Sequence, residues 1–157
     1  MTVDQPLRGH GPGVRFPPPF LFVLGFLSGL AADAGLPWRS SPRLEVVGFG
    51  LLALGLSLAF WGLWTFHWAR TAILPHKPRI RLVIAGPYRF TRNPMYVGLA
   101  STYTGLALAI HRPWPLLFLP LVLLALWHFV MRREERYLLS EFGREYEQYR
   151  RSARRWI

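Results

Sequence analysis

Cysteine is absent from the 157-residue chain, which excludes a disulfide framework, a thiolate metal site and a cysteine nucleophile. Acidic residues are scarce: 8 Asp and Glu stand against 19 Lys and Arg, and none lies between Glu45 and Glu134. The P-loop, the GxSxG elbow and the HExxH helix are also missing. These absences exclude a disulfide-stabilised domain and the enzyme classes that those motifs define.

The sequence predicts neither a metal site nor nucleic-acid binding. His67 and His128 end apolar segments, and His111 is expected on the opposite side of a membrane, so the histidines predict no metal site. The formal net charge of +11 is compatible with nucleic-acid binding. However, the basic residues flank apolar segments instead of forming a separate basic domain, so no nucleic acid is expected.

What the chain has in abundance is apolar sequence, 52% of residues against 17% charged, gathered into blocks. The blocks cover residues 17–38, 44–68, 95–110 and 114–131. This distribution predicts an all-α integral membrane protein with about four transmembrane helices. Only three residues separate the last two blocks, which predicts a tight helical hairpin. Residues 1–16 are expected to form a disordered tail before two transmembrane helices in residues 17–68.

The first block has an alternative interpretation as a signal peptide. Arg15 precedes it, and the Ala-Asp-Ala sequence around Asp33 resembles a cleavage site. A retained span is preferred, because cleavage would invert the topology of the remainder. In the second block, small residues allow close helix contacts and tryptophans suit a membrane interface. These residues are Gly48, Gly50, Gly55 and Gly62, and Trp61, Trp64 and Trp68.

The distribution of Lys and Arg predicts the orientation. Six lie between the second and third blocks and eight in the C-terminal tail, but only Arg39, Arg43 and Arg112 lie in the other two connections. By the positive-inside rule the two rich segments are cytoplasmic, and four spans then place both termini there as well.

The tail predicts a cytoplasmic amphipathic helix with an apolar stripe. Its stripe residues are Leu138, Leu139, Phe142, Tyr146 and Tyr149. Gly143 interrupts the helix as a C-cap or as a point of close packing. The alternative to a functional role is a helix lying on anionic lipid with its arginines toward the headgroups.

Two polar segments suggest a pocket at the cytoplasmic face. The stretch GPYRFTRNPMYVG contains two predicted turns, and its Pro94 suits the start of a helix. Its arginines could bind an anion, and its tyrosines could contact an aromatic base or a cation. Glu134-Glu135 supplies acid at the end of the last span. Each residue also has a simpler explanation, such as topology, helix initiation or a solvated helix face.

These two segments, collinear over residues 75–157, resemble the isoprenylcysteine carboxyl methyltransferase and phospholipid methyltransferase superfamily, in its bacterial type. The resemblance implies a small helical membrane enzyme that binds S-adenosylmethionine at its cytoplasmic face, with residues 69–157 as the cofactor-binding core. It implies an integral, multi-pass protein of the bacterial inner membrane, with the active face cytoplasmic.

The resemblance also assigns residues. It implies that the cofactor contacts His76, Leu82, Val83, Gly86, Tyr88, Asn93, Pro94, Tyr96, Glu134 and Glu135. Arg92 and Glu135 are the implied catalytic residues, and Arg92 and Arg155 the implied acceptor-binding residues. Asn93 replaces a frequent family histidine, and the Val-Pro-Arg element of the family keeps only its arginine, at Arg155. Both departures concern the methyl acceptor more than the cofactor.

The acceptor stays open between a prenylated-cysteine carboxylate, a lipid amine, a thiol and another lipid-borne or small hydrophobic group. A carboxylate acceptor needs no base, whereas for an amine or thiol Glu135 is the nearest candidate. A non-catalytic scaffold or lipid-binding protein with the same fold is the alternative from another class, and a nicotinamide-dependent membrane reductase is an enzyme alternative. The oligomeric state is not predicted.

Overall fold

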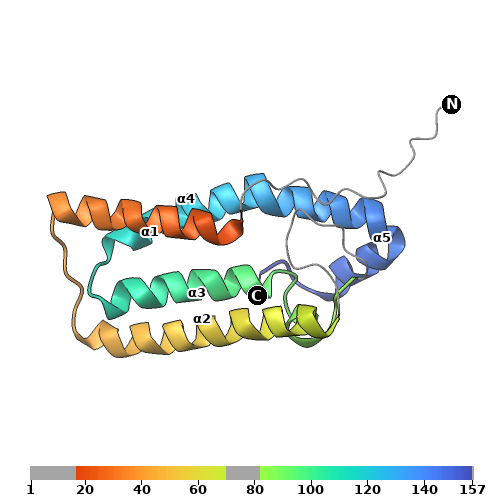
Figure 1. The fold of residues 1–157 in the computed structure, drawn as a ribbon, viewed down its shortest axis with the longest axis horizontal. Helices are drawn as coiled ribbons and strands as arrows, with labels where there is room; N and C mark the ends of the chain where they lie inside the picture. The colour runs from red at the N-terminus through yellow and green to blue at the C-terminus, as the bar shows by residue number, and fades with distance from the viewer. Residues whose placement is uncertain (1–16, 70–81, 157) are drawn as a thin grey trace.

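The computed structural model describes residues 17–69 and 82–156. It is an elongated bundle of four apolar helices with a fifth, polar helix at one end (Figure 1). The helices are α1 (Pro18–Gly35), α2 (Arg43–Trp68), α3 (Pro94–Ala109), α4 (Trp114–Leu126) and α5 (Arg132–Ser152). A 3₁₀ turn, η1 (Gly86–Arg89), precedes α3, and a π-helical turn, η2 (Trp127–Met131), joins α4 to α5. The all-α prediction is confirmed. The predicted tail of residues 1–16 lies outside the described residues.

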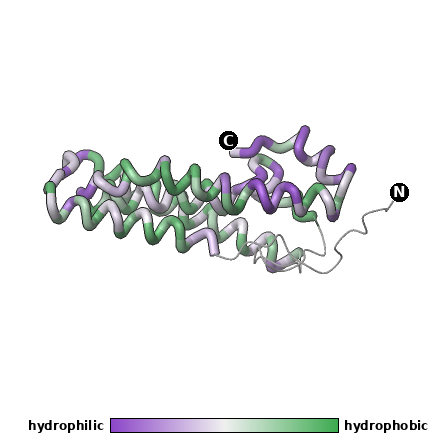
Figure 2. The backbone as a smooth tube through the Cα atoms, turned by 90° about the horizontal axis from the view of Figure 1, so that it is seen from above, coloured by the Kyte–Doolittle hydropathy of each residue, from purple (hydrophilic) through white to green (hydrophobic). Residues whose placement is uncertain are grey.

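Three described helical segments are long and apolar enough to cross a membrane: Pro18–Gly35, Arg43–Trp68, and the continuous helix that begins at Trp114. The 16 residues of α3 span about 24 Å, less than a hydrocarbon core of about 30 Å. Hydrophobic residues cover the bundle, and polar residues gather in α5 and in the connections at the far end (Figure 2). Trp61, Trp64 and Trp68 are exposed near the end of α2, as expected of an interfacial belt.

The helices associate as two pairs, α1 with α4 and α2 with α3 (Figure 1). The turn between α3 and α4 is as short as predicted, yet each of these helices packs more closely on another partner. Side chains fill the space between the pairs: Phe22, Tyr103, Val122 and Leu126 form one buried cluster there. Tyr103 also donates a hydrogen bond to the carbonyl of Pro115, 2.7 Å away.

Glycines decide this pairing, because they let backbones meet. A Cβ on Gly55 would lie 2.5 Å from the backbone nitrogen of Thr102, and one on Gly48 would lie 2.6 Å from that of Ala109. In the other pair, a Cβ on Gly29 would lie 2.4 Å from the Cα of Pro115. Of the four α2 glycines that the sequence singled out, Gly50 is the exception: its Cβ position is open, so it makes no close contact.

We expect Gly105→Ala to destabilise the bundle by about 1–3 kcal/mol, because its added methyl would lie 2.4 Å from the Leu52 nitrogen and would push α2 from α3. Gly50→Ala is the matched control: nothing lies within 4 Å of its methyl, and alanine favours a helix. Unfolding midpoints of both variants in one detergent provide the measurement. Equal midpoints would contradict the proposed role of the glycine contacts.

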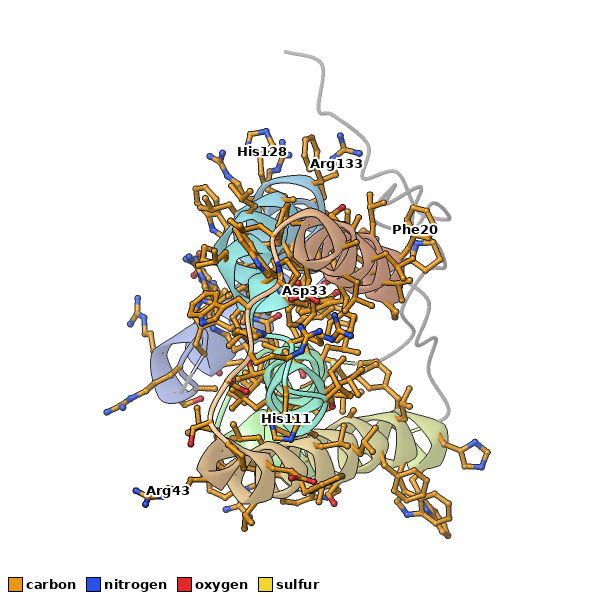
Figure 3. All side chains as sticks on the ribbon, turned by 90° about the vertical axis from the view of Figure 1, so that its left-hand side faces the viewer. Phe20, Asp33, Arg43, His111, His128 and Arg133 are labelled. Carbon is orange, nitrogen blue, oxygen red and sulfur yellow. The ribbon has the colours of Figure 1, made fainter. Side chains whose placement is uncertain are left out.

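The end of the bundle remote from α5 is closed by Asp33, which is fully buried (Figure 3). Its carboxylate accepts hydrogen bonds from Arg39, at 2.9 and 3.0 Å, and from Arg112. The indole of Trp114 donates to the Leu36 carbonyl, 2.6 Å away. The residue that suggested a signal-peptide cleavage site therefore joins the first connection to the third in the folded bundle. Two of the three arginines counted at this end, Arg39 and Arg112, form ion pairs with it.

Candidate functional site

The turn before α3 is fixed by Gly86, which has a φ of 59°. A Cβ there would lie 2.6 Å from the Thr65 hydroxyl, so this close approach to α2 requires glycine. The following Pro87 and Tyr88 are buried, and Pro94 occupies the first turn of α3 as predicted. The stretch from Gly86 to Gly98, called the polar motif from here on, is therefore folded against the end of α2.

The π-helical turn Trp127–Met131 sets the direction of the acidic pair. Such turns insert one residue into an α-helix and occur often at functional sites. After the turn, Glu134 is buried and its Oε2 accepts a hydrogen bond from the Tyr96 hydroxyl, 2.9 Å away. Glu134 thus points into the bundle although it follows a membrane-length helix.

Glu135 is held by two arginines. Its Oε1 lies 3.2 Å from Nη1 of Arg92 and 3.1 Å from Nε of Arg155, and its Oε2 lies 3.0 Å from Nη2 of Arg155. The Arg92 side chain is only 11% exposed, and its Nε is buried without a hydrogen-bond partner among the described residues.

Helix α5 turns back at Gly143, where φ is 48° and ψ is −119°. The chain then returns to the motif: Thr91 forms a parallel bridge with Arg154, and the Arg92 amide donates to the Arg154 carbonyl over 2.8 Å. The side-chain amide of Asn93 donates to the Arg155 carbonyl over 2.9 Å. The C-terminal segment consequently closes over the polar motif.

These elements enclose a cavity of about 270 Å³, near the lower end of the range of small-molecule sites. Its walls come from the α1 start, the α2 end, the polar motif, the α3 start and α5. The lining includes Leu82 and Val83 before the motif, then Tyr88, Arg92, Asn93, Pro94, Met95 and Tyr96 of the motif, and Glu134 and Glu135 of the acidic pair. Segments that are far apart in the sequence thus form one site at the α5 end of the bundle.

Nine of the twelve residues assigned by resemblance line this cavity, and two described ones, Gly86 and Arg155, do not. Gly86 shapes the turn behind the wall, and Arg155 contacts the cavity through Glu135. His76 lies outside the described residues. Residues that precede residue 69 also line the cavity, namely Pro17, Leu63 and Phe66.

The sequence missed the aromatic wall contributed by α5. Tyr146 and Tyr149 line the cavity together with Leu138, and the Tyr149 hydroxyl donates to the Tyr88 carbonyl, 2.7 Å away. Their helical spacing was visible as a stripe, but the turn at Gly143 that directs it inward was not. Leu139 does not belong to the buried stripe, because the residue is 37% exposed.

Electrostatics inside the cavity are dominated by burial. Burial raises the pKa of the Tyr146 phenol, the charge of Glu135 raises it further, and the guanidinium of Arg92 opposes both effects. Tyr146 is therefore a neutral hydroxyl at physiological pH. Among the described residues, no group of three histidine or acidic side chains is arranged to hold a metal ion.

Comparison with known proteins agrees with this architecture. A family model described as phospholipid methyltransferase matches residues 44–145, well over half of the chain. No curated protein matches the chain. The match runs from α2 into α5 and includes the polar motif and the acidic pair. The chain therefore belongs to the phospholipid methyltransferase family, whose members are membrane methyltransferases.

Proposed function

We propose that this membrane methyltransferase uses S-adenosylmethionine as its methyl donor and binds it in the cavity between the polar motif and α5. The observation that carries the proposal is the buried Glu134 carboxylate. It accepts a hydrogen bond from the Tyr96 hydroxyl, in a cavity whose lining includes several aromatic side chains. The acceptor is a lipid-borne or small hydrophobic group.

The residues of the cavity suit the donor's chemical groups. S-Adenosylmethionine carries a cationic sulfonium, an ammonium, a carboxylate, ribose hydroxyls and an aromatic base. Glu134 supplies a buried carboxylate for the ammonium or the hydroxyls. The rings of Tyr88, Tyr96 and Tyr146 suit a base or a cation, and the unpartnered Arg92 Nε suits a carboxylate.

When bound, the donor supplies an electrophilic methyl group: the acceptor atom forms a bond to the methyl carbon, the bond from that carbon to sulfur breaks, and its electron pair stays on sulfur. An amine or thiol acceptor also loses a proton, whereas a carboxylate does not. The protein's contribution is positioning and charge complementarity. Arg92 and Glu135, paired with each other, hold the polar motif against α5, which makes them positioning residues in this proposal.

Glu135 is the base candidate only for an acceptor that loses a proton. Both of its oxygens are engaged by arginines, so accepting a proton requires Arg155 to move away. The apolar wall of Leu63, Met95 and Leu99 leads from the cavity to α2 and α3 and suits the hydrophobic part of an acceptor. By the distribution of Lys and Arg, the cavity faces the cytoplasm.

Calorimetry on the purified protein in detergent tests the donor. We expect S-adenosylmethionine and its demethylated product S-adenosylhomocysteine to bind at one site, while adenosine alone binds more weakly because it lacks the ammonium and the carboxylate of the amino-acid part. No heat with a folded, helical protein would contradict the proposed donor.

Membranes containing the protein, incubated with methyl-labelled donor, test the acceptor. We expect the label in an extractable lipid or a small hydrophobic product, and base-labile label would identify a methyl ester formed on a carboxylate. Membranes without the protein are the control. Donor binding without any labelled product would favour a non-catalytic role.

A further inference from the structure

A second concavity lies on the outer side of the α4–α5 junction. Glu135 and Arg155 separate it from the cavity proposed to bind the methyl donor, which we call the donor cavity. Its volume is about 610 Å³. Its lining comprises Trp127, His128, Phe129, Arg132, Arg133, Glu135, Arg136, Leu139, Arg150 and Arg155. His128 and Arg133 point away from the centre of the bundle (Figure 3). We refer to this concavity as the arginine groove.

Among the described residues, part of the positive charge of the groove has no acidic partner. The one acid in the described lining, Glu135, already pairs with Arg92 and Arg155. Within residues 17–69 and 82–156, Arg132, Arg136 and Arg150 form no ion pair with a carboxylate. Arg132 lies 4.9 Å above the ring of Trp127, and Nε of Arg136 donates to the Arg132 carbonyl, so the two guanidinium groups are held at the groove.

The groove continues into an exposed apolar surface. Leu117, Leu121 and Leu124 are all more than half exposed on α4, and Phe129 continues this surface to the groove. In a membrane this surface contacts acyl chains, and the groove lies where the helix reaches the headgroup region. A ligand that fits both features has an apolar tail and an anionic head.

We propose that the arginine groove binds the phosphate of an anionic membrane lipid, whose acyl chains lie along the exposed face of α4. Several guanidinium groups recognise one phosphate by charge-assisted hydrogen bonds. A free phosphate would use the same arginines but would gain nothing from the apolar face. The bound headgroup lies beside Glu135, which lines both the groove and the donor cavity.

Native mass spectrometry of the purified protein provides the test, with phosphatidylglycerol and phosphatidylcholine of identical acyl chains added in equal amounts. We expect one phosphatidylglycerol to be retained in preference to phosphatidylcholine. The double variant Arg132→Gln/Arg136→Gln should retain it about 30-fold less strongly, from a contribution near fivefold for each arginine. Arg144→Gln/Arg151→Gln is the matched control, since both residues are exposed on α5 outside the groove, and it should bind like the wild type.

Three results would overturn the proposal: equal retention of the two lipids, equal loss in the groove and control variants, or displacement of the lipid by inorganic phosphate alone. Circular dichroism and donor calorimetry on each variant establish that the protein is folded. No methyl donor is present in the lipid measurement, so its outcome is separate from that of the proposed methyl transfer.

Discussion

Glu134→Gln is expected to lower kcat/KM for methyl transfer by about 100-fold while leaving the helical fold intact. The substitution keeps the volume of the side chain and retains an oxygen that can accept the bond from Tyr96. It removes the negative charge of the side chain, which we propose contacts the methyl donor. A hydrogen bond to a charged group is worth about 1.5–3 kcal/mol, and the upper part of this range applies in a buried cavity.

Two variants separate this effect from a general loss of charge. Glu141→Gln removes the same charge from an exposed position of α5 and should leave kcat/KM unchanged. Tyr96→Phe removes one hydrogen bond to Glu134 and should cost about tenfold. Calorimetry with S-adenosylhomocysteine should rank the variants in the same order, with the largest loss of affinity in Glu134→Gln, a smaller loss in Tyr96→Phe and none in Glu141→Gln. If Glu134→Gln and Glu141→Gln behave alike, Glu134 does not bind the donor and the scaffold alternative gains support.

Glu135→Ala is expected to release the C-terminal segment from the polar motif and to lower methyl transfer by more than 100-fold. The variant leaves two positive charges facing each other, one of them on the mostly buried Arg92. Removing one member of a buried ion pair costs about 3–5 kcal/mol, and the partial exposure of Glu135 and Arg155 places this case near 3 kcal/mol.

Limited proteolysis gives a readout that donor binding alone would not move. Glu135→Ala should expose the chain after Gly143 to cleavage, whereas Glu134→Gln should not. Arg155→Gln should be milder, because Glu135 keeps Arg92 as a partner. Unchanged proteolysis together with lost activity would instead assign Glu135 directly to the reaction.

The sequence was sufficient to predict the helices and to single out the polar motif and the acidic pair that line the site. Apolar blocks and Pro94 at a helix start are local patterns; the structure confirms the helices and the helix start, and three of the described helical segments are long enough to cross a membrane. The resemblance then named nine residues that do line one cavity. Hydropathy and motifs recover these features because each depends on a short stretch of chain.

Local sequence patterns could not show which helices pack against each other. The short turn between α3 and α4 predicted a helical hairpin, but it did not predict that backbone contact at glycines pairs α2 with α3 and α1 with α4. The glycines in α2 look alike in sequence, yet Gly48 and Gly55 meet a backbone whereas Gly50 faces open space. Which face of a helix meets its neighbour depends on the whole bundle.

By itself, then, the sequence determined a membrane bundle, the chemistry of its polar motif and the family resemblance. Only the tertiary structure decided that Glu134 faces the cavity while Glu135 ties Arg92 to Arg155, and that Tyr146 and Tyr149 form a wall instead of a lipid-facing stripe. The reason is physical: neighbouring glutamates point in different directions from a helix, and the positive φ at Gly143 reverses the chain after it.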